Sequence, residues 1–249
     1  MHGEEIIYQC HGIQFKGYLA YDMSYEGKRP AVIVAHGWTG QGEFTRKKAE
    51  ALAELGYIGF AIDMYGDAKT AANQQESEAL MSPLFMDRKL LQERILAAYE
   101  TVSKFRLTDS NKIGAIGFCF GGLVVVELYR SGAPVSGVVS FHGVLVDSLF
   151  GFQAKKVPLA PKISGSLLVL HGYKDPLTPQ DDLLKFEAEM NEAGVDWQLL
   201  TYGQACHAFT NPKAKAPDLG RAYDPLTDHR SWQSMRLFFK EVFHSLSAD

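Results

Sequence analysis

The sequence predicts an α/β fold with a mainly parallel central sheet flanked by helices. Two observations lead to it: short, continuous apolar runs alternate with amphipathic stretches, and no repeat, linker or low-complexity segment interrupts them. Continuous apolar runs are typical of strands buried on both faces, and alternation with helices is typical of parallel crossovers. With 249 residues and 46% apolar residues, one domain over residues 1–249 is expected.

The first expected element is a β-hairpin, because two β-rich runs, IIYQC and IQFKGYLAYD, flank the pair His11-Gly12. The strands of the parallel sheet are expected after Pro30. They are AVIVAH (31–36), YIGFAID (57–63), KIGAIGF (112–118), VSGVVSFH (135–142), SLLVLH (166–171) and VDWQLLTY (195–202).

Two amphipathic helices are expected from apolar residues that recur three or four positions apart. One spans roughly 87–105 and the other lies at the end of the chain. The apolar positions are Leu91, Ile95, Ala98, Val102 and Phe105 in the first, and Trp232, Met235, Phe239, Val242 and Leu246 in the second. Segments 64–86, 143–165 and 208–227 have no clear periodicity and follow predicted strands. They are expected to form the rim of a site at the carboxyl edge of the sheet.

Composition, charge and the N-terminal sequence favour a soluble cytoplasmic protein. The formal net charge of −4, with acids and bases interspersed, gives no reason to expect a nucleic acid or a membrane as partner. The N-terminal MHGEEIIYQCHG is acidic where a signal peptide would be basic, and no apolar run approaches the ~18 residues of a membrane span. Cys10, Cys119 and Cys206 form no close pair, so neither a disulfide framework nor a zinc site is expected.

The sequence GFCFGG (117–122) stands between the expected strand KIGAIGF and the helical run LVVVELYR. A nucleophile on such a tight strand-turn-helix connection takes a rarely populated backbone conformation, and Gly117 and Gly121 leave room for it. The N-terminus of the following helix favours a thiolate over a thiol. Cys119 is therefore the expected nucleophile.

Two further residues complete a candidate catalytic triad in the chain order nucleophile, acid, histidine. Asp175 in HGYKDPLTP follows the expected strand SLLVL, and His207 in ACHAFTNP follows WQLLTY. Both should reach the sheet edge where Cys119 lies. His207 would take the thiol proton and later activate water, while Asp175 would orient the imidazole. Backbone amides of Trp38, in the loop HGWTG, and of Phe120 are the expected oxyanion donors.

The chain resembles the dienelactone hydrolase family of the α/β-hydrolase superfamily over nearly its whole length. The motifs that carry the resemblance are GFCFGG, HGYKDPLTP and ACHAFTNP. The resemblance implies an α/β-hydrolase fold and a carboxylic ester hydrolase. It would cleave a small ester or enol-lactone through an acyl-thiol intermediate, as a monomer or homodimer and without metal or organic cofactor.

The sequence departs from the family at two positions. Gly37 stands where the best-known members carry a glutamate near the nucleophile, and Asp67 lies near the place of an arginine that holds the substrate carboxylate. Lys69 or Arg88 is an alternative source of a cation. These departures leave the identity of the substrate open, dienelactone included.

Other histidines close expected strands, and two interpretations are open. His36, His142 and His171 each precede a glycine, and could be metal ligands or could brace the oxyanion loop and the Asp175 turn. Bracing is expected, because no carboxylate spacing supports a metal. His36 and Tyr65 are also the expected contacts with substrate. Cys206 is expected to pack away from the site.

Alternative functions remain open at this stage. A thioesterase, a peptidase-like activity or another acyl hydrolase could use the same triad, and an α/β-hydrolase-fold binding domain without catalysis is a further alternative. A nucleotide-binding protein is disfavoured, because GAIGFCFGG lacks the G-x-G-x-x-G spacing and carries two bulky phenylalanines.

Overall fold

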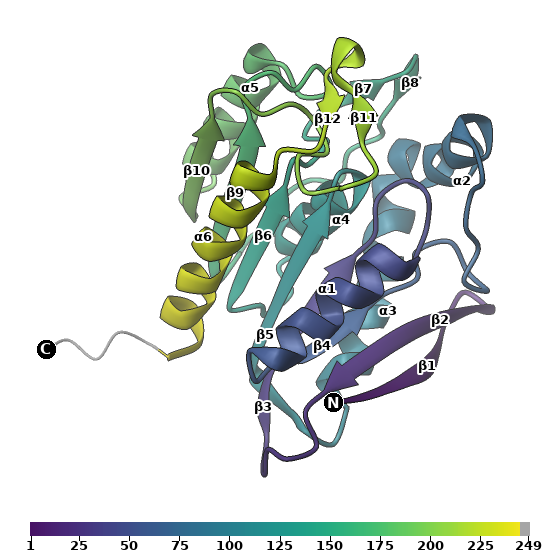
Figure 1. Cartoon of the computed structure of the whole chain (residues 1–249), viewed down its shortest axis with the longest axis vertical. Helices are drawn as coiled ribbons and strands as arrows, with labels where there is room; N and C mark the ends of the chain where they lie inside the picture. Colours follow the sequence, from purple (N-terminus) through teal and green to yellow (C-terminus); the bar gives the residue numbers. More distant parts are fainter. Residues whose placement is uncertain (245–249) are drawn as a thin grey trace, which may run out of the picture.

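The computed structural model describes residues 1–244, so the expected Leu246 of the last helix lies outside the described residues. Eight strands form one twisted sheet in the order β1-β2-β4-β3-β5-β6-β9-β10 (Figure 1). The pairs β1-β2 and β2-β4 are antiparallel, and all other neighbouring pairs are parallel. The strands are β1 (His2–Cys10), β2 (Ile13–Tyr21), β3 (Arg29–Ala35), β4 (Ile58–Ala61), β5 (Thr108–Phe118), β6 (Gly137–Phe141), β9 (Ser166–Gly172) and β10 (Asp196–Tyr202).

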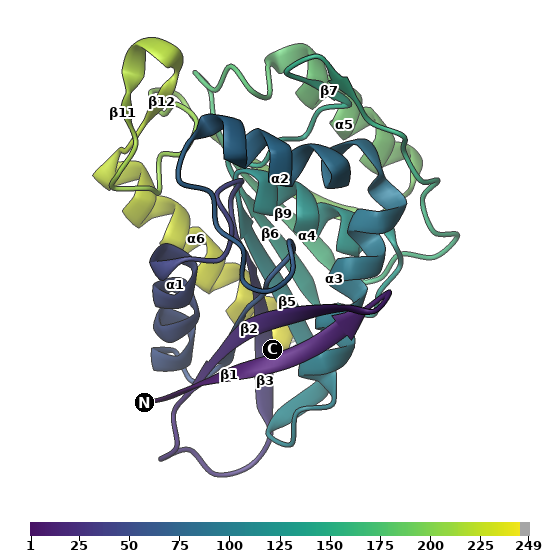
Figure 2. The same ribbon diagram turned by 90° about the vertical axis from the view of Figure 1, so that its right-hand side faces the viewer.

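Helices cover both faces of this sheet. Helices α1 (Glu43–Glu54) and α6 (Pro225–His244) lie on one face, and α3 (Arg88–Ser103), α4 (Phe120–Arg130) and α5 (Gln180–Glu192) lie on the other (Figures 1 and 2). Helix α2 (Gln74–Met86) packs on α3. Among residues 1–244, no helix combines the length and the apolarity that crossing a bilayer requires.

Burial of the central strands on both sides explains their continuous apolar sequences. In β3, Ala31, Ile33 and Ala35 belong to the core beneath α3 and α4, whereas Val32 and Val34 belong to the core beneath α1 and α6. Alternate residues of a strand point to opposite faces, so a strand with helices on both sides must be apolar throughout. This arrangement confirms the predicted α/β-hydrolase fold.

The N-terminal hairpin is also confirmed. His11 and Gly12 join β1 to β2 with φ of 50° and 74°, the left-handed conformations that a two-residue hairpin turn needs. Helix α3 lies within the predicted range 87–105.

Residues 74–86, within the segment 64–86 expected at the rim, form helix α2. Ser77, Met81, Leu84 and Phe85 are its buried positions, spaced as in an amphipathic helix, but Ser77 is polar and Pro83 interrupts the last turn. The helix start had a readable signal: Asn73 caps the amide of Glu76, and the Glu76 side chain returns to the cap.

Two small hairpins form the remaining rim, above the carboxyl edge of the sheet. One joins β7 (Ser148–Leu149) to β8 (Phe152–Gln153), and the other joins β11 (Lys215–Ala216) to β12 (Arg221–Ala222) (Figure 1). Both hairpins fall in segments without clear periodicity, because each strand has only two residues and is too short to show one.

Candidate active site

Cys119 occupies a strained turn between β5 and α4. Its φ of 58° and ψ of −120° lie in a region that side chains rarely adopt. A Cβ added to Gly117 would lie 1.9 Å from the carbonyl oxygen of Gly121, and one added to Gly121 would lie 2.3 Å from that of Ala35. Strand and helix therefore approach so closely that both neighbouring positions need glycine, as the sequence predicts.

The structure brings Asp175 and His207 together at the same edge of the sheet. Asp175 Oδ2 lies 2.7 Å from His207 Nδ1, and both side chains are buried. The other oxygen of Asp175 accepts the amide of Leu177 at 2.8 Å, so the carboxylate is held at both atoms. His207 Nε2 has no hydrogen-bond partner among residues 1–244, which leaves it free for proton exchange. The Asp175 contact thereby fixes the imidazole tautomer.

Charge in this site favours a thiolate-imidazolium pair. Burial alone would raise the pKa of the Cys119 thiol, but the positive charge of His207 and the amide of Phe120 lower it below its ordinary value. Burial alone would lower the pKa of His207, but the charges of Cys119 and Asp175 raise it well above its ordinary value. An activated cysteine needs a base and a charge environment of this kind.

The loop after β3 carries the expected oxyanion donor Trp38. The Trp38 amide has no hydrogen-bond acceptor among residues 1–244, whereas its carbonyl accepts the Tyr65 hydroxyl at 2.8 Å. The amide of Phe120 is the first of helix α4. An amide at a helix start and a free amide on a fixed loop are the donors that an oxyanion needs.

His36 and Tyr65 do not meet the expectation of substrate contact. His36 is fully buried, where Nδ1–H donates to the Gly37 carbonyl at 2.6 Å and Nε2 accepts the Met64 amide at 3.1 Å. Tyr65 is 5% exposed, and its hydroxyl donates a hydrogen bond to the Trp38 carbonyl. Both residues brace the oxyanion loop, which is the role expected for the strand-end histidines.

Sequence analysis missed Asp63, which fixes the segment after β4. Its carboxylate accepts the amides of Tyr65, Gly66 and Ala68 at 2.8 to 3.0 Å, although it is fully buried. The available signal was an acid directly after an apolar strand and just before a Tyr-Gly pair, since a buried carboxylate must find donors nearby.

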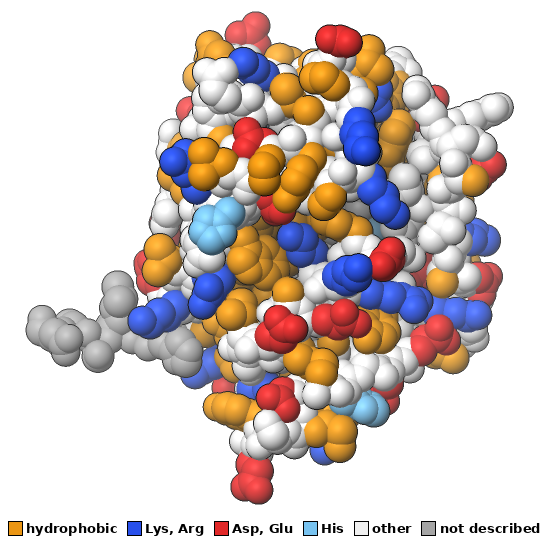
Figure 3. All heavy atoms as spheres, in the orientation of Figure 1, with side chains coloured by type: hydrophobic (Ala, Val, Ile, Leu, Met, Phe, Trp, Pro, Cys, Tyr) orange, Lys and Arg blue, Asp and Glu red, His pale blue; other side chains and the backbone are white. Residues whose placement is uncertain are grey.

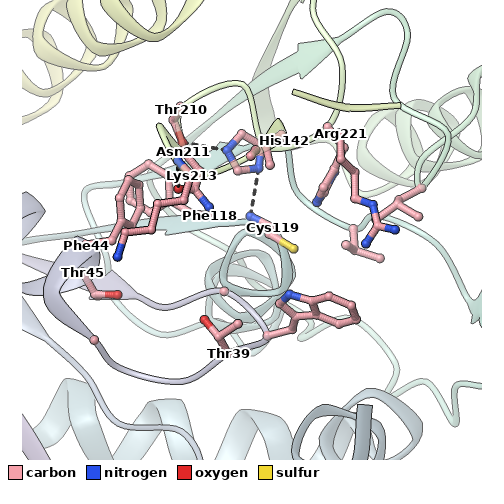
Figure 4. A pocket seen from close by; sticks show the side chains of 18 of the residues that line it. Thr39, Phe44, Thr45, Phe118, Cys119, His142, Thr210, Asn211, Lys213 and Arg221 are labelled. Carbon is pink, nitrogen blue, oxygen red and sulfur yellow. Dashed lines mark hydrogen bonds between the residues drawn. The ribbon is translucent and has the colours of Figure 1, made fainter. Parts of the chain in front are cut away.

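A cavity of roughly 820 Å³ opens in front of Cys119. Figure 3 shows a hollow in this face with hydrophobic side chains at its floor and Lys and Arg side chains near its edges. Figure 4 shows the Cys119 sulfur pointing into the pocket, with Phe44 and Lys213 on one side and Arg221 on the other. The apolar lining includes Trp38, Phe44, Phe118, Val144, Leu149 and Phe150.

The mouth of the cavity carries more positive than negative charge. Lys47, Lys213, Lys215 and Arg221 line it, and the one acid, Glu43, pairs with Lys47 at 2.8 Å. Backbone contacts with residue 207 place Arg221 at the cavity. The His207 amide donates to the Gly220 carbonyl, and residues 207 and 221 form a parallel bridge. The guanidinium of Arg221 lies 6.0 Å from the Trp38 ring centroid.

The two cations expected from the sequence, Lys69 and Arg88, lie outside the cavity lining. Arg88 is buried beneath the 144–155 segment, where it donates to the Val146 carbonyl, and neither it nor Lys69 lines the cavity. Cys206 also lies outside the lining. A Cβ built on Gly37 would lie 3.7 Å from that of Cys119, so this position touches the nucleophile without bringing an acid to it.

Comparison with known proteins finds relatives over nearly the whole chain. A model of the dienelactone hydrolase family matches residues 15–243. "Protein usf" of Aquifex pyrophilus is 26% identical over 96% of this chain and 98% of its own length. The structure named m3DLH is 38% identical with a TM-score of 0.89, covering 97% of this chain and 98% of its own. A dienelactone hydrolase-like promiscuous phosphotriesterase, P91 from metagenomic libraries, has a TM-score of 0.89, is 33% identical and shows the same coverage.

The family match extends over most of the chain and the two structural relatives share its fold from end to end. The chain therefore belongs to the dienelactone hydrolase family of hydrolases.

Proposed function

We propose that the protein hydrolyses a small ester or enol-lactone through the triad Cys119, His207 and Asp175. The observation that carries the proposal is the combination of a strained, glycine-flanked Cys119 with a His207–Asp175 pair of 2.7 Å in one pocket. A thiolate nucleophile, an oriented base and a substrate cavity are the parts that acyl transfer through sulfur needs.

In the acylation half-reaction, the Cys119 thiolate attacks the carbonyl carbon and the carbonyl electron pair moves onto oxygen. The amides of Trp38 and Phe120 stabilise that oxyanion. Collapse breaks the bond to the leaving oxygen, which takes the proton from His207 Nε2. In a lactone the leaving oxygen stays tethered to the acyl group. An acyl-thiol on Cys119 results.

In the deacylation half-reaction, His207 Nε2 takes a proton from water as the water oxygen attacks the acyl-thiol. The second oxyanion collapses, the carbon–sulfur bond breaks and the Cys119 thiolate leaves. The balance is one ester and one water in, one carboxylic acid and one alcohol or enol out. Asp175 stabilises the His207 cation in both halves.

The pocket also suggests how the substrate is held. Arg221 has no ion-pair partner among residues 1–244, and it projects beside Trp38 at the mouth of an apolar cavity. A substrate with an apolar body and an anionic end would suit this arrangement. The cation that pairs with the substrate would then be Arg221 of β12, and not a residue of the segment after β4.

Rapid mixing with p-nitrophenyl acetate tests the proposal. The wild type should release about one equivalent of p-nitrophenol in a burst, and Cys119→Ala should show neither burst nor turnover, because no acyl-thiol can form. Cys206→Ala is the matched control, since that thiol is next to His207 in sequence but outside the cavity lining. Turnover retained by Cys119→Ala would contradict the proposal.

Hydrolysis of another acyl substrate and hydrolysis of a phosphotriester are second candidate activities. A thioesterase or another acyl hydrolase would use the same triad, and only the leaving group would differ. The 33% identity to a promiscuous phosphotriesterase adds neutral phosphotriesters. Comparing kcat/KM for matched oxygen esters, thioesters and diethyl 4-nitrophenyl phosphate on one preparation ranks the three.

A further inference from the structure

His142 lies next to the backbone of Cys119 and links it to the loop that carries His207. It follows β6, is 2% exposed, and its imidazole meets that of His207 edge-on at 5.2 Å between centroids. It has a φ of 38°, which is uncommon for a residue other than glycine. The strand-end histidines were expected to brace the oxyanion loop and the Asp175 turn, and no contact with the nucleophile was predicted for them.

Two hydrogen bonds fix the His142 ring at both nitrogens. The backbone amide of Cys119 donates to Nδ1 at 3.1 Å and shares this bond with the Phe141 carbonyl, also at 3.1 Å, while Nε2 lies 2.8 Å from the hydroxyl oxygen of Thr210 (Figure 4). Because Nδ1 accepts, the neutral ring carries its proton on Nε2 and donates it to Thr210. Burial and the positive charge of His207 hold the pKa of His142 well below its ordinary value, which agrees with a neutral ring.

The backbone around Cys119 has no room to relax toward this turn. A Cβ added to Gly122 would lie 2.5 Å from the Cα of Gly143, so the start of α4 and the turn after β6 are in direct contact. The Val144 amide donates to the Cys119 carbonyl at 3.3 Å. The strained residue is therefore held at its amide and at its carbonyl by the same turn.

We infer that His142 is a positioning residue: through its neutral ring it holds the Cys119 amide and, through Thr210, keeps the nucleophile in register with the loop of His207. Thr210 stands three residues after His207, and both are buried. This inference rests on the proposed function. A shift of less than 1 Å between nucleophile and base lowers the rate of an acyl transfer without affecting substrate affinity to the same extent.

Substitutions at position 142 separate the two hydrogen bonds. In His142→Asn the amide oxygen takes the place of Nδ1 and can accept from Cys119. In His142→Gln the amide group takes the place of Nε2 and can reach Thr210. His142→Phe keeps a ring of similar size without either bond. Thr210→Val removes the second partner, and Thr210→Ser retains the hydroxyl.

The readouts are kcat and KM for p-nitrophenyl acetate, the alkylation rate of Cys119 with iodoacetamide, and Tm. His142→Phe should lower kcat and the alkylation rate by up to about tenfold, with KM changed less than about threefold. The Cys119 amide loses its bond to His142 but keeps the Phe141 carbonyl, and the loss of one neutral hydrogen bond at the nucleophile has that size. His142→Asn should recover most of the loss and His142→Gln little of it. Thr210→Val should lower kcat and the alkylation rate when it is made in the wild type, and much less when it is made in a His142→Phe background.

Each outcome decides the matter. A purely packing role would change Tm while kcat and alkylation stay at wild-type values in all three variants, and that result overturns the inference. So does a His142→Gln variant that outperforms His142→Asn. Should His142→Phe fail to fold, the Asn and Gln pair and the Thr210 pair give the same test. An unreactive Cys119 in the wild type would instead refute the proposed function itself.

Discussion

The floor and the mouth of the cavity are built in opposite ways. On the floor, Cys119, Asp175 and His207 follow sheet strands, and the Asp175 and His207 side chains are buried and hydrogen-bonded to each other. At the mouth, Phe150 lies in the turn of one small hairpin and Arg221 on a two-residue strand of the other, and Phe150 is 44% exposed. The floor suits fixed chemistry, whereas the mouth has few contacts to keep its shape and is free to differ between relatives.

This difference predicts where substitutions act. A change on the floor should lower kcat by a large factor, since it disturbs groups that contact the reacting atoms. A change at the mouth should alter KM and substrate preference by a small factor and leave the chemistry intact. The four predictions below test that division, beginning with the largest effect.

The largest effect is expected from Asp175→Asn. The amide would still occupy the space but would no longer stabilise the His207 cation or fix its tautomer, so kcat should fall by up to about 10⁴. Steady-state ester hydrolysis measures it. Asp182→Asn on helix α5 serves as control because, among residues 1–244, Asp182 forms an ion pair with Lys185 alone and does not line the cavity. A loss below tenfold would mean that the acid is dispensable on this floor.

Alkylation of Cys119 should persist to lower pH than that of an ordinary thiol. Its pKa is lowered and that of His207 raised, so the ion pair persists between them and is lost as pH falls through the first or rises through the second. An ordinary thiol is only about 0.3% thiolate at pH 6, so His207→Ala should slow iodoacetamide labelling there by about 100-fold.

Cys10 provides an internal control in the same labelling reaction. Burial and the charge of Glu93 raise the pKa of its thiol, so its labelling should increase steadily from pH 6 to 9. Peptide mapping by mass spectrometry separates the two cysteines. If the labelling of Cys119 rises with pH as that of Cys10 does, the floor holds an ordinary thiol and the comparison with the mouth fails.

The same division decides what the sequence could predict. Continuous apolar strands, the glycines around Cys119 and the strand-end positions of Asp175 and His207 follow from burial and topology, which leave a local pattern in the chain. The mouth leaves none: Arg221 reaches the cavity only because the chain returns past His207, and the residue 142 to 210 contact joins segments 68 positions apart. Such contacts are tertiary, and spacing along the chain does not encode them.

At the mouth, Arg221→Gln should weaken binding of anionic substrates and spare neutral ones. A half-exposed charge pair contributes modestly, so KM for an ester with a free carboxylate should rise about tenfold or less, while KM for p-nitrophenyl acetate stays within about twofold. Lys69→Gln is the matched control, since Lys69 is exposed and does not line the cavity. Equal changes for both esters would show that Arg221 supports the loop instead of the ligand.

The smallest effect, and the most informative about the mouth, is expected from Phe150→Asn. Phe150 and Gly151 form the two-residue turn between β7 and β8 with φ of 51° and 82°. Asn-Gly is the preferred pair in such a turn, whereas a phenylalanine with positive φ is strained. Its ring lies 6.2 Å from that of Trp38 and lines the cavity, so contact with a ligand explains a residue that the turn disfavours.

Phe150→Asn should therefore leave Tm unchanged or raise it slightly, because the turn loses strain, while kcat/KM for an aryl ester falls a few-fold through KM. Phe150→Leu, which keeps an apolar group but not the ring, should lie between the two. A lower Tm with unchanged KM would show that the ring stabilises the hairpin against Trp38 and that the mouth, like the floor, is held for structure. Activity and stability moving in opposite directions would place the hairpin on the substrate side of the division, where strain is tolerated for binding.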